Sequence, residues 1–197
     1  MSLTVEKCLQ AWTNSFRQMK VKADIVFFGD SLTYYGDFAS VFPGRIVCNL
    51  GLRGDTLLGM IDRVEQLGLL EPRIVFLMAG INDVSLPLEE FKRQYSMLAD
   101  SIIKVKSAPT LFILSILPVN SADYCISCNN EQIRQYNNCI KEIAVNERCH
   151  FIDMFADYYD EYKGLLSREL TRDGIHIISS AYNIWYNKAT MAVNDIL

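Results

Sequence analysis

Five short apolar segments, separated by longer segments with helical periodicity, constrain the fold of this chain more than any other feature of its sequence. Each apolar segment is long enough for one strand, and in several the residues between the ends are all apolar. Such runs are typical of strands that are covered on both faces of a parallel sheet. The strands are expected within 24–28, 45–48, 73–79, 110–116 and 150–152.

The intervening segments repeat apolar residues at the three- and four-residue spacing of an amphipathic helix. After Pro87, for example, Phe91, Tyr95, Leu98 and Ile102 fall on one helical face. Strands that alternate with helices form a parallel sheet with helices on both faces. We therefore expect an α/β fold, a three-layer α/β/α sandwich with a five-stranded parallel sheet, in one domain over residues 1–197. Further helical faces are expected in 5–19, in 57–67 after the caps Asp55 and Thr56, in 133–143, and in 182–196 after a cap at Ser179.

The composition argues against two classes of partner. The 19 Lys and Arg residues against 23 Asp and Glu give a formal charge of −4 without any basic run, so a nucleic-acid partner is not expected. The apolar stretches are strand-sized, far below the ~20 residues that span a bilayer. Residues 1–10 lack a signal-peptide pattern, and the six dispersed cysteines, with Cys8 and Cys48 in apolar patterns, suit a reduced protein. A cytoplasmic location is therefore expected.

Glycines and polar residues follow the first four expected strands. Right-handed crossovers bring the strand-to-helix turns of a parallel sheet to one edge, where α/β folds bind ligands. We therefore expect these turns to converge on one mouth. They are Gly29-Asp30-Ser31, Asn49-Leu50-Gly51, Gly80-Ile81-Asn82-Asp83 and Pro118-Val119-Asn120.

Ser31, Asp173 and His176 have the chemistry of a nucleophile with its base. Ser31 follows a strand at the start of a helical turn, where backbone N–H groups can stabilise an anion. In Asp173-Gly174-Ile175-His176 the carboxylate can turn back to Nδ1–H and leave Nε2 as a base. Each residue also has a structural interpretation, because Ser31 suits an N-cap and Asp173 suits a loop cap of the last helix.

Asn82 and Gly51 occupy similar turns, and their structural interpretations are an Asx-turn and a tight turn with positive φ. Together, Gly29-Asp30-Ser31-Leu32, Gly51, Gly80-x-Asn82-Asp83 and Asp173-x-x-His176 are more specific than any one of them. In these four blocks, in their order, the sequence resembles the SGNH (GDSL-type) hydrolase family. The resemblance implies a flavodoxin-like sandwich that hydrolyses carboxylic esters.

The resemblance also implies the site residues. Ser31 matches the nucleophile, and His176 and Asp173 complete its triad, while the Ser31 N–H, the Gly51 N–H and the Asn82 side-chain amide match the oxyanion hole. Ser31 would attack the ester carbonyl and form an acyl-enzyme that water hydrolyses. Hydrogen bonds polarise the carbonyl, so no metal or cofactor is expected, and the expected partner is a small-molecule ester.

Two other classes of function compete with this interpretation. Cys125-x-x-Cys128 is compatible with a zinc or redox site only if further ligands join it, and the spacing to Cys139, Cys149 and His150 fits no compact zinc module. A flavodoxin-like binding or receiver module is the non-enzyme alternative, with Asp30 as a phosphoacceptor. That alternative lacks a lysine in the strand-end turns and leaves the pair of Asp173 and His176 without a role.

The expected substrate carries a short acyl group, with acetyl favoured, and its alcohol could be a carbohydrate. This expectation follows from a compact chain without a long lid and from a loose resemblance to the acetylhydrolase and carbohydrate-esterase branches of the family. Tyr34, Tyr35 and Phe38 follow the nucleophile and could line the acyl site or pack in the core. Arg53 could meet a polar or anionic leaving portion or be a surface residue. Lysophospholipase and thioesterase activity remain alternatives on the same fold.

Overall fold

The computed structural model describes residues 21–194 and 196. Its main sheet has five parallel strands in the order β2-β1-β3-β4-β5, which confirms the expected fold class. The strands are β1 (Ile25–Gly29), β2 (Val47–Gly51), β3 (Ile74–Met78), β4 (Thr110–Leu114) and β5 (His150–Ile152). The strand expected within 45–48 begins later, at Val47, and ends later, at Gly51. Its bounds follow the pairing with β1, in which Ile25 lies opposite Val47 and Gly29 opposite Gly51.

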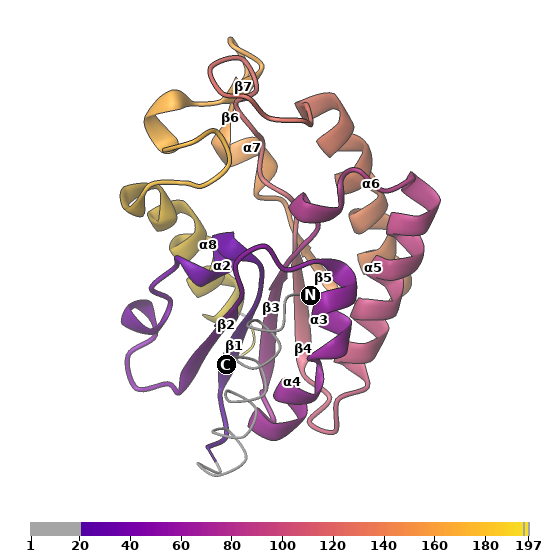
Figure 1. Cartoon of the computed structure of the whole chain (residues 1–197). Coiled ribbons are helices and arrows are strands. Elements are labelled where there is room, and N and C mark those ends of the chain that lie inside the picture. The colour runs from indigo at the N-terminus through magenta and orange to yellow at the C-terminus, as the bar shows by residue number, and fades with distance from the viewer. Residues whose placement is uncertain (1–20, 195, 197) are drawn as a thin grey trace.

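Alternate residues of the central strands enter two separate cores. Val26 and Phe28 of β1 pack in one core with Phe91 and Tyr95, whereas their neighbour Phe27 packs in the other with Trp185. The first core lies under α3 to α6 and the second under α8, which gives the three layers in Figure 1. These helices are α3 (Leu57–Asp62), α4 (Glu65–Leu70), α5 (Leu88–Ile103), α6 (Asn130–Asn146) and α8 (Tyr182–Asn194).

The remaining elements are short. Two of them are helices, α2 (Ser31–Tyr34) and α7 (Phe155–Tyr158), and two form a small antiparallel ladder, β6 (Tyr159–Asp160) and β7 (Leu165–Leu166). The described residues also contain four 3₁₀ turns, at Ala39–Val41, Ile81–Asp83, Arg168–Leu170 and Ser179–Ala181.

Two expectations about helices were wrong in detail. The helix expected in 57–67 is interrupted between α3 and α4 at Arg63, because this buried side chain is directed to the ends of β1 and β2. Ser179 does not cap the last helix with its side chain, since it is already the first residue of a 3₁₀ turn that precedes α8. Thr56 does cap α3 by accepting from the Gly59 N–H. The helix expected in 5–19 and the burial of Cys8 lie outside the described residues.

The carboxyl ends of the strands lie at one edge of the sheet, where the loops after β1, β2, β3 and β4 gather (Figure 1). Asn137 of α6 holds the loop after β4 in place. Its side chain accepts from the Ile116 N–H and donates to the Ile116 carbonyl. Within residues 21–194, no helix is long and apolar enough to cross a membrane.

Candidate active site

Ser31 is the first residue of α2, two residues beyond the end of β1. The N-cap is Asp30, whose carboxylate accepts from the Leu32 N–H at 2.9 Å. Ser31 is therefore not the cap, and its hydroxyl is available for another partner. Its N–H belongs to the first turn of a helix, whose N–H groups have no partner within the helix.

A glycine is required two residues before this serine. A Cβ on Gly29 would lie 2.3 Å from the Met78 carbonyl oxygen and 2.3 Å from Thr33 Oγ1. No larger residue fits at this point, where β1 runs against β3 and turns directly into α2. The close approach lets the chain pass from β1 into α2 and so places Ser31 at the carboxyl edge of the sheet.

His176 and Asp173 form a local pair within a tight turn. His176 Nδ1 lies 2.7 Å from Asp173 Oδ2, and the other carboxylate oxygen accepts from the His176 N–H at 2.8 Å. Gly174 has φ +88°, a conformation that a residue with a side chain rarely adopts. Thr171 holds the turn from both sides, because its hydroxyl donates to the His176 carbonyl and accepts from the Gly174 N–H.

The same imidazole reaches Ser31, which is 145 residues away in the sequence. His176 Nε2 lies 2.8 Å from Ser31 Oγ. A continuous chain of hydrogen bonds thus joins the serine hydroxyl, the imidazole and the Asp173 carboxylate. With Nδ1–H donated to the carboxylate, Nε2 accepts from the serine and can take its proton, which is the arrangement that activates a hydroxyl nucleophile.

The Asp173 carboxylate is held in its ionised form. Partial burial raises its pKa, but hydrogen bonds from the His176 N–H, the His176 ring and the Ile175 N–H outweigh that effect, so the pKa lies below its usual value. An ionised carboxylate stabilises the imidazolium that forms when the ring accepts a proton.

The Gly51 N–H already has a hydrogen-bond partner within the chain. It donates to Asn49 Oδ1 at 2.8 Å, and the Asn49 amide donates in turn to the carbonyls of Thr33 and Gly36. The expectation that Gly51 supplies an oxyanion donor therefore needs correction, because this N–H already has a partner. Gly51 has a steric role instead, since a Cβ there would lie 2.1 Å from the Tyr34 nitrogen.

Asn82 lies in the 3₁₀ turn Ile81–Asp83 that follows β3. One N–H of its side-chain amide donates to the Asp55 carbonyl at 2.8 Å, which leaves the second N–H for another acceptor. Asp55 closes a turn with Leu52, and the Gly54 N–H inside this turn has no hydrogen-bond partner among the described residues. Gly54 has φ +70°. Sequence reasoning missed it as a candidate donor, although a glycine in the turn after β2 is a signal that could have pointed to it.

Behind the nucleophile lies a buried cluster of charged residues. The Arg63 guanidinium pairs with Asp55 at 2.7 Å and donates to the carbonyls of Leu50 and Gly29, so it connects the ends of β2 and β1. Burial raises the pKa of Asp30 to about 7 and that of Asp83 to about 6, and the charge of Asp55 adds to both effects. Asp30 is thus a buried structural acid, with no exposed carboxylate to serve as a phosphoacceptor.

Aromatic and basic side chains surround the imidazole. The Tyr35 ring meets the His176 ring edge to face at 5.6 Å, and Tyr34 meets Tyr35 in the same manner at 5.2 Å. Both tyrosines are exposed, so Tyr34 is not a core residue. The guanidinium groups of Arg53 and Arg172 also lie near the Tyr35 ring. Phe38, the third aromatic residue after Ser31, is instead buried in the core. Sequence reasoning missed Arg172 as a residue of this site.

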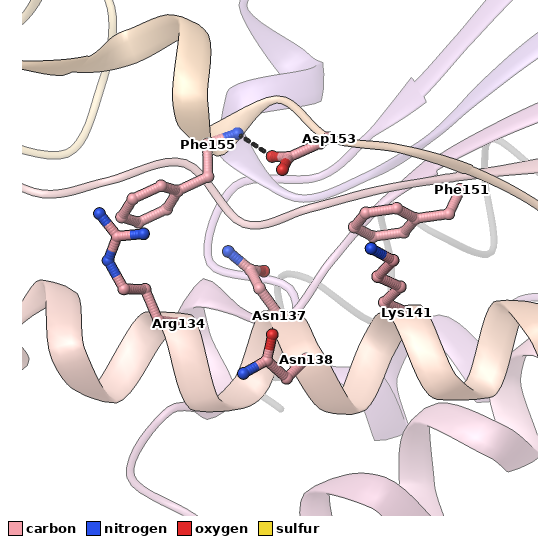
Figure 2. Close-up of a pocket in the computed structure, with 7 residues that line it drawn as sticks. All are labelled: Arg134, Asn137, Asn138, Lys141, Phe151, Asp153 and Phe155. Carbon is pink, nitrogen blue, oxygen red and sulfur yellow. Dashed lines mark hydrogen bonds between the residues drawn. The ribbon is translucent and has the colours of Figure 1, made fainter.

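A hollow of about 220 Å³ between α6 and the segment from β5 to α7 is separate from these residues (Figure 2). Two of its polar groups already have partners: Asn137 bonds the Ile116 backbone, and Asp153 accepts from the Phe155 N–H. In the described part of the chain no group of three or more His, Cys, Asp and Glu could hold a metal ion. Cys125 is exposed and Cys128 is buried, and both are free thiols.

The chain resembles a known protein family and several solved structures. The sequence model of the GDSL-like lipase/acylhydrolase family matches residues 27–184. A GDSL-like lipase from Bacteroides thetaiotaomicron superposes with a TM-score of 0.79 at 18% identity over 96% of this chain and 98% of that chain. An acetyl xylan esterase superposes with a TM-score of 0.74 at 20% identity over 86% and 98% of the two chains. Identities this low establish a common fold alone.

An N-acylneuraminate cytidylyltransferase from Streptococcus agalactiae serotype V is 23% identical over 181 residues. The matched region is 89% of this chain but 40% of that protein. The chain therefore spans less than half the length of this relative.

Proposed function

The chain belongs to the GDSL-like lipase/acylhydrolase family, and from this premise we propose that it is an ester hydrolase. In this proposal Ser31 is the nucleophile, His176 the general base and Asp173 the residue that orients the base. The observation that carries the proposal is the unbroken series of contacts from Ser31 Oγ to His176 Nε2 and from His176 Nδ1 to Asp173 Oδ2. The three residues come from two distant parts of the sequence and meet at the strand ends, where α/β folds bind ligands.

The reaction follows from these contacts. Ser31 Oγ forms a bond to the carbonyl carbon of the ester while its proton passes to His176 Nε2. The tetrahedral intermediate then expels the alcohol, which receives that proton, and an acyl-enzyme remains on Ser31. Water gives its proton to the same nitrogen, attacks the acyl carbon and releases the carboxylic acid, and Ser31 recovers its proton from His176.

The oxyanion of the tetrahedral intermediate needs donors at the same edge. We assign this role to the Ser31 N–H at the start of α2 and to the second N–H of the Asn82 amide. The Gly54 N–H is the better third donor, because it has no partner among the described residues whereas the Gly51 N–H is bonded to Asn49. The link from Asn82 to the Asp55 carbonyl holds the Gly54 turn beside the Asn82 side chain.

The acyl group that suits this site is short, with acetyl favoured. The structural similarity to an acetyl xylan esterase supports the same choice and is compatible with a carbohydrate alcohol.

The test compares para-nitrophenyl acetate, butyrate and octanoate as substrates of the wild-type protein and of Ser31→Ala. Activity should fall steeply beyond butyrate and should be absent in Ser31→Ala. Ser40→Ala is the matched control, because Ser40 is an exposed serine that bonds only the Asp37 carbonyl, and this variant should retain wild-type rates. Equal or faster hydrolysis of octanoate would contradict the short acyl group and favour a lysophospholipase-like or thioesterase-like substrate. Wild-type activity in Ser31→Ala would contradict the nucleophile.

A further inference from the structure

Two arginines from different loops approach the same ring at the mouth of the site. Arg53 lies in the turn after β2, and its guanidinium carbon is 5.8 Å from the centroid of the Tyr35 ring. Arg172 directly precedes the turn that carries Asp173 and His176, and its guanidinium carbon is 5.4 Å from the same centroid. Because the Tyr35 ring itself meets the His176 ring at 5.6 Å, both positive charges lie close to the catalytic base.

Neither charge is neutralised within the part of the chain that the structure describes. The side chains of Arg53 and Arg172 make no ion pair and no hydrogen bond there, and each contacts the Tyr35 ring instead. The two nearest carboxylates in the sequence already have partners, because Asp173 accepts from His176 and Asp55 pairs with the buried Arg63.

The exposed arginine Arg93, by contrast, is paired with Glu90. Other exposed arginines, such as Arg73 and Arg148, also form no ion pair among the described residues. What distinguishes Arg53 and Arg172 is that both lie at the mouth of the site, in a chain whose formal net charge is −4. A contact with an aromatic ring leaves the edge of a guanidinium free to donate hydrogen bonds.

We infer that Arg53 and Arg172 bind a negative charge on the substrate, so that the preferred substrate is an acyl ester whose alcohol portion carries a carboxylate or a phosphate. This inference rests on the proposed function and specifies its substrate class. A guanidinium matches either anion with two parallel N–H donors, and it is the side chain best suited to recognise such planar or multidentate acceptors.

The position of the arginines assigns the charge to the alcohol and not to the acyl group. The departing alcohol takes its proton from His176 Nε2, so it must lie on the imidazole side of the scissile bond. Tyr35 and both arginines lie on that side, since the Tyr35 ring contacts the imidazole directly.

The experiment compares three aryl acetates that differ at the para position of the leaving phenol: para-acetoxybenzoate, the phosphate monoester para-acetoxyphenyl phosphate, and the neutral para-acetoxybenzamide. The wild-type protein should show a kcat/KM for at least one anionic ester about tenfold above that for the amide. Whichever anion is preferred identifies carboxylate or phosphate as the recognised group. The preference should shrink in about 1 M NaCl, where the Debye length is about 3 Å.

The variants Arg53→Gln and Arg172→Gln should each reduce the ratio of anionic to neutral kcat/KM several-fold, and the double variant should abolish the preference. The matched control is Arg73→Gln, which removes the same charge at the opposite edge of the sheet, just before β3, and should leave the ratio unchanged. A separate pair of substrates, para-nitrophenyl hemisuccinate and para-nitrophenyl butyrate, tests for charge on the acyl side.

The outcomes separate this inference from the proposed function. Hydrolysis of all three acetates with equal kcat/KM, or a preference that survives in the double variant, overturns the inference while the nucleophile assignment stands. A preference confined to the hemisuccinate overturns the assignment of the charge to the alcohol. Failure to hydrolyse any ester, together with no labelling of Ser31 by a fluorophosphonate, overturns the proposed function and the inference with it.

Discussion

Replacement of Asp30 by asparagine should remove most of the dependence of stability on pH between about pH 4 and pH 7. Asp30 is 1% exposed, and burial raises its pKa from 3.8 to about 7; the Leu32 N–H and the Arg63 charge oppose this rise, and the charges of Asp55 and Asp83 add to it. The folded protein therefore keeps this proton in a range where the unfolded chain has already lost it. Stability contributed by the protonated acid is fully present below about pH 4 and is lost as the pH rises through about 7.

The magnitude follows from the two pKa values. A difference of about three units corresponds to about 4 kcal/mol, which is the largest loss that Asp30 can cause once it is ionised in the folded state. In Asp30→Asn the new side chain would imitate the protonated acid, since its oxygen can still accept from the Leu32 N–H and it carries no charge. Asp30→Asn should therefore exceed the wild-type protein in stability at pH 8 and approach it near pH 4.

The assay is urea unfolding of both proteins at several pH values and constant ionic strength. A smaller slope should remain in Asp30→Asn, because burial also raises the pKa of Asp83 to about 6. Glu161→Gln serves as a control at an exposed carboxylate and should follow the wild-type curve. If the Asp30→Asn curve ran parallel to the wild-type curve across this range, Asp30 would not be the buried acid that we describe.

Three further substitutions test the site and its support. Asp173→Asn should lower kcat by about 10³- to 10⁴-fold, because an amide N–H facing Nδ1 favours the wrong imidazole tautomer, and steady-state kinetics with an unchanged circular dichroism spectrum would check this. Asn82→Ala should lower kcat by about 10²- to 10³-fold through loss of one oxyanion donor, whereas a change in KM alone would contradict that role. Arg63→Met should destabilise the fold by about 3–5 kcal/mol in urea unfolding, because Asp55 would stay buried without its counter-ion. The double variant with Asp55→Asn should recover part of that loss, and no recovery would argue against the ion pair.

The strands and the histidine turn could be predicted because their signals are local. Continuous apolar runs such as Ile74–Met78 reflect burial on both faces, and the structure has them in strands of the central sheet. The pairing of Asp173 with His176 depends on a three-residue step and on the glycine between them, so the sequence alone contains its geometry. The contact of His176 with Ser31 was expected from the resemblance to the SGNH hydrolase family, because no spacing in the sequence relates two residues 145 positions apart.

Other features depend on contacts between distant segments. Arg172 joins the site through the ring of Tyr35, and no spacing in the sequence relates these two residues. The break between α3 and α4 follows from the carbonyls that Arg63 binds on two strands. The partner of the Gly51 N–H, by contrast, could have been predicted from the sequence. Asn49 precedes Gly51 by two residues, and an Asn at that spacing commonly accepts from the backbone.

The most direct test of a serine hydrolase at the strand edge is to trap its acyl-enzyme. Wild-type protein mixed with para-nitrophenyl acetate, quenched in acid and examined by mass spectrometry should gain one acetyl group, which peptide mapping should place on Ser31. Ser31→Ala should gain none and should not turn over the ester. An acetyl group on another residue, or turnover that persists in Ser31→Ala, would contradict the central claim.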